Sequence, residues 1–361
     1  MTLRHYLRPT AFVDAPFGHD GKVARLAGGM LWFAAVERLT MEGDRILSSE
    51  LVPVERVETA LAGLGAGAER AWRNLTSPRP ALQLRERVVR LDQPQVAGIL
   101  NLTPDSFSDG GRFDGAEAAV QAGFAMAEAG AAIVDVGGES TRPGARPVWE
   151  GDEVERVLPA IARLAAGGTA VSIDTRKAAV MDAALGAGAA MVNDVSALTF
   201  DDHAPGIVAR AGCPVVLMHH LGTPETMQQA PSYRKPVLLA VYDWLEARIA
   251  AAEAAGIGRD RIIVDPGIGF GKTVQHNLDL LNGLALLHGL GCPVMLGASR
   301  KRMIGALSAE APADARLPGS LALALKGADQ GVQLLRVHDV PETVQALRVW
   351  RGLRDAALTP P

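Results

Sequence analysis

Eight short apolar runs, separated by segments of helical length, constrain the fold of this chain more than any other feature. The runs begin at Gln95, Ala131, Ala170, Ala190, Pro214, Arg261, Pro293 and Val332. Each is apolar throughout, without alternation of polar and apolar residues, as in parallel strands that are covered on both faces. Eight β–α units over residues 93–361 indicate a (β/α)8 TIM barrel, for which roughly 250 residues is typical. The alternative is an open doubly wound sheet, for which eight units would be many.

The first part of the chain does not follow this rhythm. It contains the apolar stretch GGMLWFAAV and an amphipathic segment near Val54–Leu64 that predicts a helix. We therefore predict two parts, a small N-terminal extension of uncertain fold over residues 1–92 and the barrel over residues 93–361. The segment PETVQALRVWRGLRDAAL is expected to form the last barrel helix.

Composition narrows the class of protein. The net charge of -4 and the pI near 6.1 argue against a general binder of nucleic acid or anionic membranes. The N-terminal residues lack the apolar core of a signal peptide, and no apolar run approaches the roughly 20 residues that span a bilayer. Cys213 and Cys292 each precede a proline at the start of an apolar run, which favours buried free thiols. We expect a soluble cytoplasmic protein with no nucleic-acid or membrane partner.

Polar residues lie at or near the carboxyl ends of the apolar runs. They are Asn101, Asp135, Asp174, Asn193, His219, Asp265, Ser299 and His338. A polar side chain inside a barrel core costs several kcal/mol unless it is satisfied, whereas the C-terminal mouth is where such barrels place their active sites. Any one of these residues could instead cap a helix. All eight together predict one polar cavity.

The stretch DPGIGFGKT, residues 265–273, resembles the end of a phosphate-binding loop. That loop requires a glycine five residues before Gly271, where this chain has Pro266, which donates no N–H group. A dinucleotide fingerprint also fails, because Lys272 occupies the position of its third glycine. The glycine-rich turn therefore needs another role.

The residues themselves suggest two adjoining sub-sites. Thr141 and Arg142 follow the second run, Arg336 and His338 lie on one side of the last strand, and Lys301 lies beside a helix start, so these donors suit a phosphate group. A buried structural pair with an aspartate is the alternative for Arg336. Asp174, Asn193 and Asp265 offer acceptors and an amide, which suit a planar heterocycle rich in N–H groups. The sequence has no evident Ser–His–Asp arrangement, and the adjacent His219 and His220 do not suit a paired metal site.

The ordered motifs resemble those of bacterial dihydropteroate synthases. They are NLTPDSFSDGG, DVGGESTRPGA, SIDTRK, VNDVSAL, LMHHLGTPETMQ, VDPGIGFGKTVQHNLDLL, GASRKRMIG and LLRVHDV, which together cover residues 95–340. The resemblance implies a TIM-barrel transferase of folate biosynthesis. Such an enzyme joins 6-hydroxymethyl-7,8-dihydropterin pyrophosphate to 4-aminobenzoate and releases pyrophosphate. It also implies Mg²⁺, a homodimer and a target for sulfonamides.

The same resemblance assigns roles by motif position. The pterin would be bound by Asp174, Asn193, Met218, Asp265, Lys301 and Arg336. The pyrophosphate would be bound by Thr141, Arg142, Arg336 and His338, and the aminobenzoate by Pro143, Phe270 and Ser299. Asn101 and Asp109 match positions associated with Mg²⁺, and Asp109, Arg142 and Lys301 are the predicted catalytic residues.

One departure and two rival functions accompany this assignment. Family members commonly have serine after the S-R-K triplet, where this chain has Arg302. Arg302 could add a cation near the aminobenzoate or turn outward. The rivals are a methyltetrahydrofolate-dependent corrinoid methyltransferase, which needs no pyrophosphate site, and a non-catalytic pterin-binding paralogue.

Overall fold

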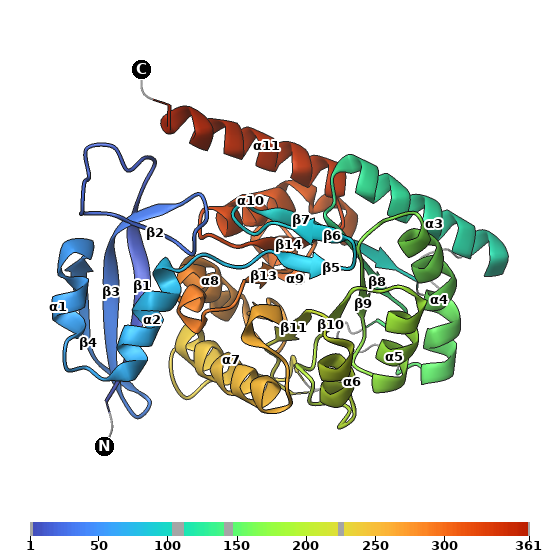
Figure 1. The fold of residues 1–361 in the computed structure, drawn as a ribbon, viewed down its shortest axis with the longest axis horizontal. Coiled ribbons are helices and arrows are strands. Elements are labelled where there is room, and N and C mark those ends of the chain that lie inside the picture. Colours follow the sequence, from blue (N-terminus) through green and yellow to red (C-terminus); the bar gives the residue numbers. More distant parts are fainter. Residues whose placement is uncertain (1–2, 103–111, 141–146, 223–226, 360–361) are drawn as a thin grey trace.

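The fold is a barrel with a smaller antiparallel sheet against its side (Figure 1). The structure is a computed structural model that describes residues 3–102, 112–140, 147–222 and 227–359. The chain runs from the small sheet through a short hairpin into the barrel, and the last helix, α11 (Val340–Ala357), extends from the barrel back towards the sheet.

Eight parallel strands form the barrel, as the sequence predicted. They are β7 (Gln95–Asn101), β8 (Ile133–Gly137), β9 (Val171–Asp174), β10 (Met191–Asp194), β11 (Val215–Met218), β12 (Ile262–Asp265), β13 (Met295–Leu296) and β14 (Leu334–Val337). Their order is β12-β11-β10-β9-β8-β7-β14-β13. A parallel bridge between Val264 and Val294 joins β12 to the start of β13 and closes the ring. The closure excludes the open doubly wound sheet.

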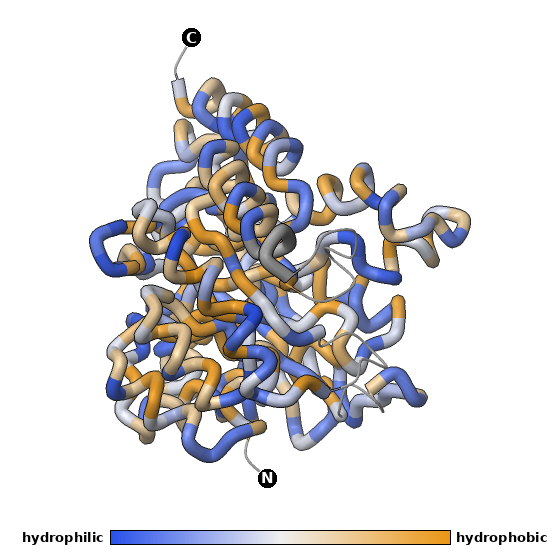
Figure 2. Tube along the Cα trace, turned by 90° about the vertical axis from the view of Figure 1, so that its right-hand side faces the viewer, coloured by the Kyte–Doolittle hydropathy of each residue, from blue (hydrophilic) through white to orange (hydrophobic). Residues whose placement is uncertain are grey.

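Helices on the outside connect successive strands. They are α3 (Arg112–Ala129), α4 (Glu150–Ala166), α5 (Ala178–Ala187), α6 (Ala204–Ala211), α7 (Val237–Ala254), α8 (Val274–Gly283), α9 (Arg302–Leu307), α10 (Leu317–Ala328) and α11, with the 3-10 turns η3 (Arg259–Arg261), η4 (Leu284–Leu290) and η5 (Ala313–Ala315). Buried apolar residues of the strands and of these helices form one large cluster, and Figure 2 shows apolar segments running through the middle of the molecule. After α7, Gly256 has a φ of 93°, the left-handed conformation that a helix C-terminus favours. Among the helices of the described residues, none is long and apolar enough to cross a membrane.

The N-terminal extension has a fold of its own. Its elements are β1 (Leu3–Val13), β2 (Ala24–Arg25), β3 (Trp32–Glu42), β4 (Arg45–Pro53), η1 (Val54–Arg56), α1 (Val57–Leu61) and α2 (Ala66–Thr76). Strand β3, which contains most of the stretch GGMLWFAAV, pairs antiparallel with β1, β2 and β4. Phe33, Val36 and Leu75 are fully buried in the core of this unit, and Ala285 of η4 completes the same cluster. The extension therefore packs directly on the barrel.

Polar contacts fix the extension on the side of the barrel. The Tyr6 hydroxyl donates to Asp243 of α7 at 2.8 Å, and Asn74 donates from its side chain to the Gly289 carbonyl of η4 at 2.8 Å. At the far end of α11, Arg354 donates to Asp14 at 3.1 Å and to the Met30 carbonyl at 3.0 Å. These bonds tie the extension to α7, η4 and α11 of the barrel.

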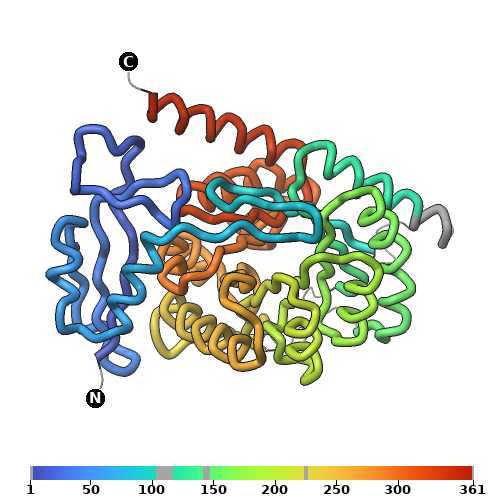
Figure 3. The backbone as a smooth tube through the Cα atoms, viewed as in Figure 1, coloured from blue at the N-terminus to red at the C-terminus, as the bar shows by residue number. Residues whose placement is uncertain are grey.

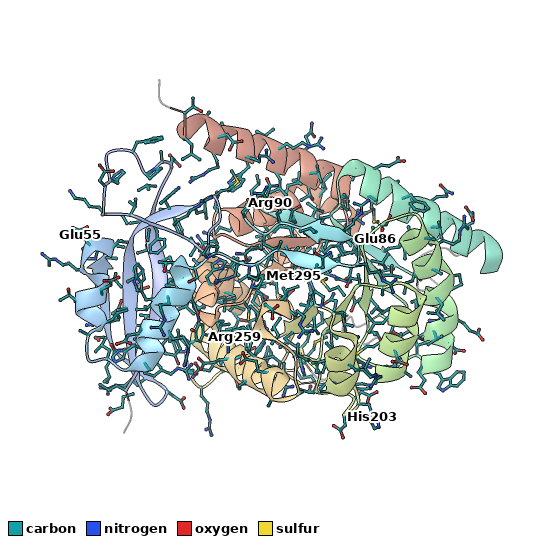
Figure 4. The ribbon with its side chains drawn as sticks, viewed as in Figure 1. Glu55, Glu86, Arg90, His203, Arg259 and Met295 are labelled. Carbon is teal, nitrogen blue, oxygen red and sulfur yellow. The ribbon has the colours of Figure 1, made fainter. Side chains whose placement is uncertain are left out.

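A short hairpin closes the amino-terminal end of the barrel. Strands β5 (Leu82–Leu84) and β6 (Arg87–Val89) pair antiparallel and cross this end, as the cyan tube in Figure 3 shows. Leu82, Leu84 and Val89 form one apolar cluster with inward residues of the strands, among them Met295, which is labelled in Figure 4. The hairpin precedes the predicted boundary at residue 92, yet its core is shared with the barrel.

Both cysteines are buried and unpaired, as the sequence predicted. Burial raises the pKa of the Cys213 thiol to about 11 and that of Cys292 to about 12. The thiols are therefore protonated and unreactive at neutral pH.

Candidate active site

The inward positions of the strands change from apolar to polar towards the carboxyl ends. Because side chains alternate along a strand, residues two apart face the same side, about 7 Å further along. In β8, Ile133 belongs to the cluster beneath the barrel mouth, and the next inward position is Asp135. In the same way Met191 is followed by Asn193, and Leu334 by Arg336. The barrel therefore has an apolar floor under the hairpin and a polar mouth.

Strand register places three predicted residues in one row. Asn101 pairs with Gly137, Gly137 pairs with Asp174, and Asp174 pairs with Asn193. Residues that pair across parallel strands point to the same face, so these side chains share the mouth. Gly137 adds no side chain to this row; a β-carbon there would be in van der Waals contact with the Asp174 β-carbon at 3.5 Å and the Asn101 amide oxygen at 3.7 Å.

Asp135 and Arg336 form the centre of the polar mouth. Arg336 donates through Nε to Asp135 at 2.6 Å and through a second nitrogen to Asp174, and Asn193 donates to the same Asp135 oxygen at 2.9 Å. Arg336 is thus paired with aspartates, which was the alternative to a phosphate-binding role. These ion pairs nevertheless lie at the barrel mouth, among the candidate ligands. Asp135 was among the eight polar residues expected in the cavity, but the sequence assigned it no role. Its inward position two residues before Gly137 puts it in contact with Arg336 and Asn193.

Asp174 retains an acceptor that is not used by the protein. Its Oδ1 is buried and has no hydrogen-bond partner among the residues that the structure describes. Burial raises the pKa of Asp174 to about 7, and the nearby Arg336 guanidinium only partly offsets this effect. A buried oxygen of this kind is stabilised by a ligand that donates an N–H group.

Asp265 lies across the mouth at the end of β12. One of its oxygens accepts the Gly267 N–H at 2.6 Å, and Met218, which is buried, is its register partner on β11. Burial raises the pKa of Asp265, whereas the Gly267 N–H, Lys301, Arg336 and Lys272 lower it. A β-carbon on Gly297 would lie 3.7 Å from Asp265 Oδ2 and 3.9 Å from the Arg336 side chain, so Arg336, which bonds Asp174, also lies near Asp265.

The glycine-rich turn after Asp265 has a steric explanation. Gly267, Gly269 and Gly271 have φ values of 65°, 87° and 66°, which side chains rarely adopt. A β-carbon on Gly267 would lie 1.8 Å from the His219 carbonyl oxygen, and one on Gly271 would lie 2.6 Å from Leu221. The glycines allow this turn to lie against the loop after β11, so they shape the mouth and are not needed to bind a nucleotide.

Two further contacts join predicted residues from different loops. The Lys301 ammonium lies 4.2 Å from the centre of the Phe270 ring, a cation–π contact. Ser299 Oγ and His338 Nδ1 are 3.0 Å apart, and the His338 backbone N–H donates to the same hydroxyl at 3.2 Å. Since that hydroxyl already accepts one hydrogen bond, it can donate its proton to the His338 ring.

Lys272 and His219 form a buried polar pair; His219 was expected in the cavity, but neither residue was assigned a binding or catalytic role. The Lys272 ammonium lies 2.8 Å from His219 Nδ1 and 2.9 Å from the Phe270 carbonyl oxygen. Burial lowers the pKa of Lys272 to about 7, and burial together with the Lys272 charge lowers the pKa of His219 well below 6.5. His219 is therefore neutral at neutral pH and accepts from Lys272 at Nδ1.

Some predicted residues cannot be placed. Asp109, Thr141, Arg142 and Pro143 lie outside the described residues. Of the two predicted Mg²⁺ ligands, Asn101 lies at the end of β7 and is partly exposed. Within the described part of the chain, no group of three or more His, Cys, Asp or Glu side chains is arranged to hold a metal ion.

Arg302 is exposed at the first position of α9, directly after Lys301. Lys301 is the N-cap residue before this helix and is only partly exposed. The sequence left two orientations open for Arg302, and its exposure favours the outward one.

Comparison with known proteins agrees with this geometry. Residues 97–338 match the profile of a family described as pterin binding enzyme. Dihydropteroate synthase of Escherichia coli strain K12 is 46% identical over 260 residues, which cover 72% of this chain and 91% of the relative. The chain belongs to the dihydropteroate synthase family. The synthase of Mycobacterium leprae is 48% identical over 261 residues, covering 71% of this chain and 92% of the relative.

Solved structures of the family have the same fold. A Xanthomonas albilineans dihydropteroate synthase with 4-aminobenzoic acid has a TM-score of 0.72 at 48% identity and covers 76% of this chain and 98% of its own. The Xanthomonas enzyme in complex with 7,8-dihydropteroate has a TM-score of 0.70 at 46% identity and covers 76% and 99%. A Yersinia pestis synthase with a sulfonamide drug complex has a TM-score of 0.72 at 42% identity and covers 76% and 99%.

Proposed function

We propose that this enzyme condenses 6-hydroxymethyl-7,8-dihydropterin pyrophosphate with 4-aminobenzoate to give 7,8-dihydropteroate and pyrophosphate. The observation that carries the proposal is that Asp174, Asp265 and Arg336 lie at the carboxyl ends of their strands, with Arg336 bonded to Asp174 and near Asp265. Family members that bind 4-aminobenzoic acid and 7,8-dihydropteroate support the same substrates.

The pterin would lie among the inward acids of the mouth. Asp174 Oδ1 and Asp265 provide buried acceptors on separate strands, and a carboxylate suits the guanidine-like edge of a pterin ring. Asn193 adds an amide, Met218 provides an apolar wall, and Lys301 adds a cation. Asp135 would hold Arg336 and Asn193 in place beneath the ring.

The pyrophosphate would leave towards the cationic side of the mouth. His338 and Arg336, together with Thr141 and Arg142, would donate to its oxygens. Hard oxygen donors suit Mg²⁺, so the amide of Asn101 and the carboxylate of Asp109 fit the ion on chemical grounds. When bound, Mg²⁺ would neutralise charge that develops on the departing pyrophosphate.

The chemical step requires no covalent enzyme intermediate. The C–O bond to pyrophosphate breaks and the leaving group takes the electron pair, while the buried carboxylates stabilise the positive charge on the pterin. The 4-aminobenzoate nitrogen then forms the new C–N bond and loses a proton. Phe270, Ser299 and Pro143 would hold the arylamine, and the Lys301–Phe270 contact joins this sub-site to the pterin.

A coupled assay tests the proposal. Purified protein with Mg²⁺, the pterin pyrophosphate and 4-aminobenzoate should form dihydropteroate and pyrophosphate in equal amounts. Methyl transfer from methyltetrahydrofolate to a corrinoid would instead identify the rival methyltransferase, and pterin binding without product would identify a non-catalytic paralogue. We also propose that the enzyme is a cytoplasmic homodimer inhibited by sulfonamides, which sedimentation and inhibition assays would examine.

Arg142→Ala tests the pyrophosphate sub-site separately. Loss of this guanidinium should lower kcat on the order of 100-fold, because the residue would stabilise charge that develops on the leaving group. Affinity for 6-hydroxymethylpterin, which carries no pyrophosphate, should change less than about threefold. Equal losses in the two measurements would contradict the assigned role.

A further inference from the structure

Lys272 is a buried cation for which the proposed function supplies no role. Its side chain is 3% exposed, and it lies in the glycine-rich turn whose resemblance to a phosphate-binding loop fails. Burial of a lysine is costly unless its charge or its hydrogen bonds are matched. A fully buried ammonium at the rim of an active site therefore requires an explanation.

The contacts of Lys272 connect two separate loops. Its ammonium reaches His219 Nδ1 at 2.8 Å in the loop after β11, and the Phe270 carbonyl at 2.9 Å in the loop after β12. The His219 N–H in turn donates to the Asp265 carbonyl at 2.9 Å. The Lys272 side chain thus links the loops that follow β11 and β12, next to Asp265.

The neighbouring geometry shows that this link is specific. Gly267 and Gly271 on either side allow the turn to approach the His219 loop more closely than any side chain would permit. The His219 ring is fixed from behind by Trp244, whose ring lies edge-on at 5.0 Å between centroids. Tyr233 donates to the Gly271 carbonyl at 2.9 Å and Gln228 donates to the Gly269 carbonyl, so carbonyls on both sides of Phe270 are also held.

The link ends at the residue that forms the arylamine sub-site. The Phe270 carbonyl accepts a hydrogen bond from Lys272, and the Phe270 ring centre lies 4.2 Å from the Lys301 ammonium. A shift of the Phe270 backbone would therefore move the ring and change the contact with Lys301. The hydrogen bond from Lys272 to the Phe270 carbonyl therefore gives this lysine a route to the arylamine sub-site.

We propose that Lys272 is a positioning residue that, by bonding His219 and the Phe270 carbonyl, fixes the Phe270 ring and thereby sets affinity for 4-aminobenzoate. The inference rests on the proposed function, because it names the sub-site that the arylamine would occupy. A purely structural lysine would affect both substrates alike. A positioning lysine affects the arylamine selectively.

Lys272→Met is the first test, since methionine keeps the length of the side chain and removes its donors. The KM for 4-aminobenzoate should rise about tenfold or more, while the Kd for the pterin pyrophosphate, measured without arylamine, should change less than about threefold. Lys326→Met in α10 provides the matched control and should leave both values within about twofold. Equal losses for the two substrates, or no change in the KM for 4-aminobenzoate, would overturn the proposal.

A double variant tests whether Lys272 acts through Phe270. Phe270→Leu removes the ring, and it should reproduce the loss of arylamine affinity. Adding Lys272→Met to Phe270→Leu should then cost less than about twofold more, because residues that act as one unit are not additive. Full additivity would show that Lys272 acts by another route.

A spectroscopic measurement separates failure of this inference from failure of the proposed function. In protein with labelled histidine, the His219 Nδ1 resonance should shift in Lys272→Met and not in Lys326→Met. If wild-type protein makes no dihydropteroate, the function is wrong whatever this resonance does. If wild-type protein is active but His219 does not respond, the hydrogen bond on which the inference rests is absent.

Discussion

A single buried amine should make stability depend on pH. Lys272 has a pKa of about 7 in the folded protein, lowered by burial and by Lys301 and raised by Asp265, against 10.5 for the ordinary side chain. Between these values the unfolded chain binds more protons, so folded-state stability rises with pH through this window. Below pH 7 both states are protonated, and the cost of the buried ammonium is then fully present.

Urea unfolding of wild-type protein and Lys272→Met at pH 7 and pH 9 measures this effect. The free energy of unfolding of the wild type should rise relative to the variant by about 2 kcal/mol between the two pH values. His219 is the neighbour most affected by the substitution, but its pKa lies below this window. Parallel pH dependence in the two proteins would show that Lys272 keeps an ordinary pKa.

Arg302 offers a second test at the scale of one residue. Because Arg302 is exposed at the start of α9, Arg302→Ser should change the KM for 4-aminobenzoate less than about twofold. Inhibition by a sulfonamide should change equally little. Steady-state assays of the wild type and Arg302→Ser measure both the KM and the inhibition constant. A fivefold change in either one would place the Arg302 side chain near the arylamine.

At the scale of elements, a buried charge cluster joins the loop after β8 to α4 and α5. Lys177, the N-cap residue of α5, bonds Glu153 of α4 at 2.6 Å, Glu139 at 3.1 Å and the Val148 carbonyl at 2.6 Å. Burial raises the pKa of Glu139, but the Val148 N–H, Arg176 and Lys177 together hold it below its ordinary value. All three charged side chains are buried, so each depends on the others.

This cluster predicts an asymmetric response to substitution. Lys177→Met should destabilise by about 3 to 5 kcal/mol, because it leaves Glu153 buried without its cation. The double variant Lys177→Met with Glu153→Met should recover part of that loss, since it removes the unpaired Glu153 charge while Glu139 keeps its ion pair with Arg176. Thermal and urea unfolding of the three proteins measures both effects. A double variant as unstable as the single one would mean that packing, and not charge, dominates here.

The strands of the barrel could be predicted from the sequence, whereas the hairpin and the buried contacts between loops could not. Unbroken apolar runs identified the eight strands because burial on both faces leaves no room for polar residues, and the polar ends followed from the position of the mouth. Hairpin β5–β6 was missed because its strands have three residues each, too few for a pattern. Lys177 and Glu153 are 24 residues apart and Lys272 and His219 are 53 apart. Such contacts depend on which loops the closed barrel brings together, and no local pattern encodes that.

At the scale of the whole molecule, the extension and the hairpin make different contributions. The family profile begins at residue 97, after both of them. The small sheet covers η4 from outside, whereas the hairpin fills the floor beneath the active site with Leu82, Leu84 and Val89. The first is an added unit on the surface of a closed barrel. The second is part of the barrel core.

Two truncations distinguish these contributions. Deletion of residues 1–77 removes the sheet and α2 but keeps the hairpin, so we expect a folded protein with synthase activity within about threefold of the full chain and a lower Tm. Deletion of residues 1–91 also removes the hairpin and exposes the floor of the barrel, which at about 25 cal/mol per Å² of apolar surface should cost several kcal/mol. That protein should bind a hydrophobic dye and lose activity. If both truncations instead lost activity equally while remaining folded, the outer sheet itself, and not the hairpin, would be the part that supports the mouth.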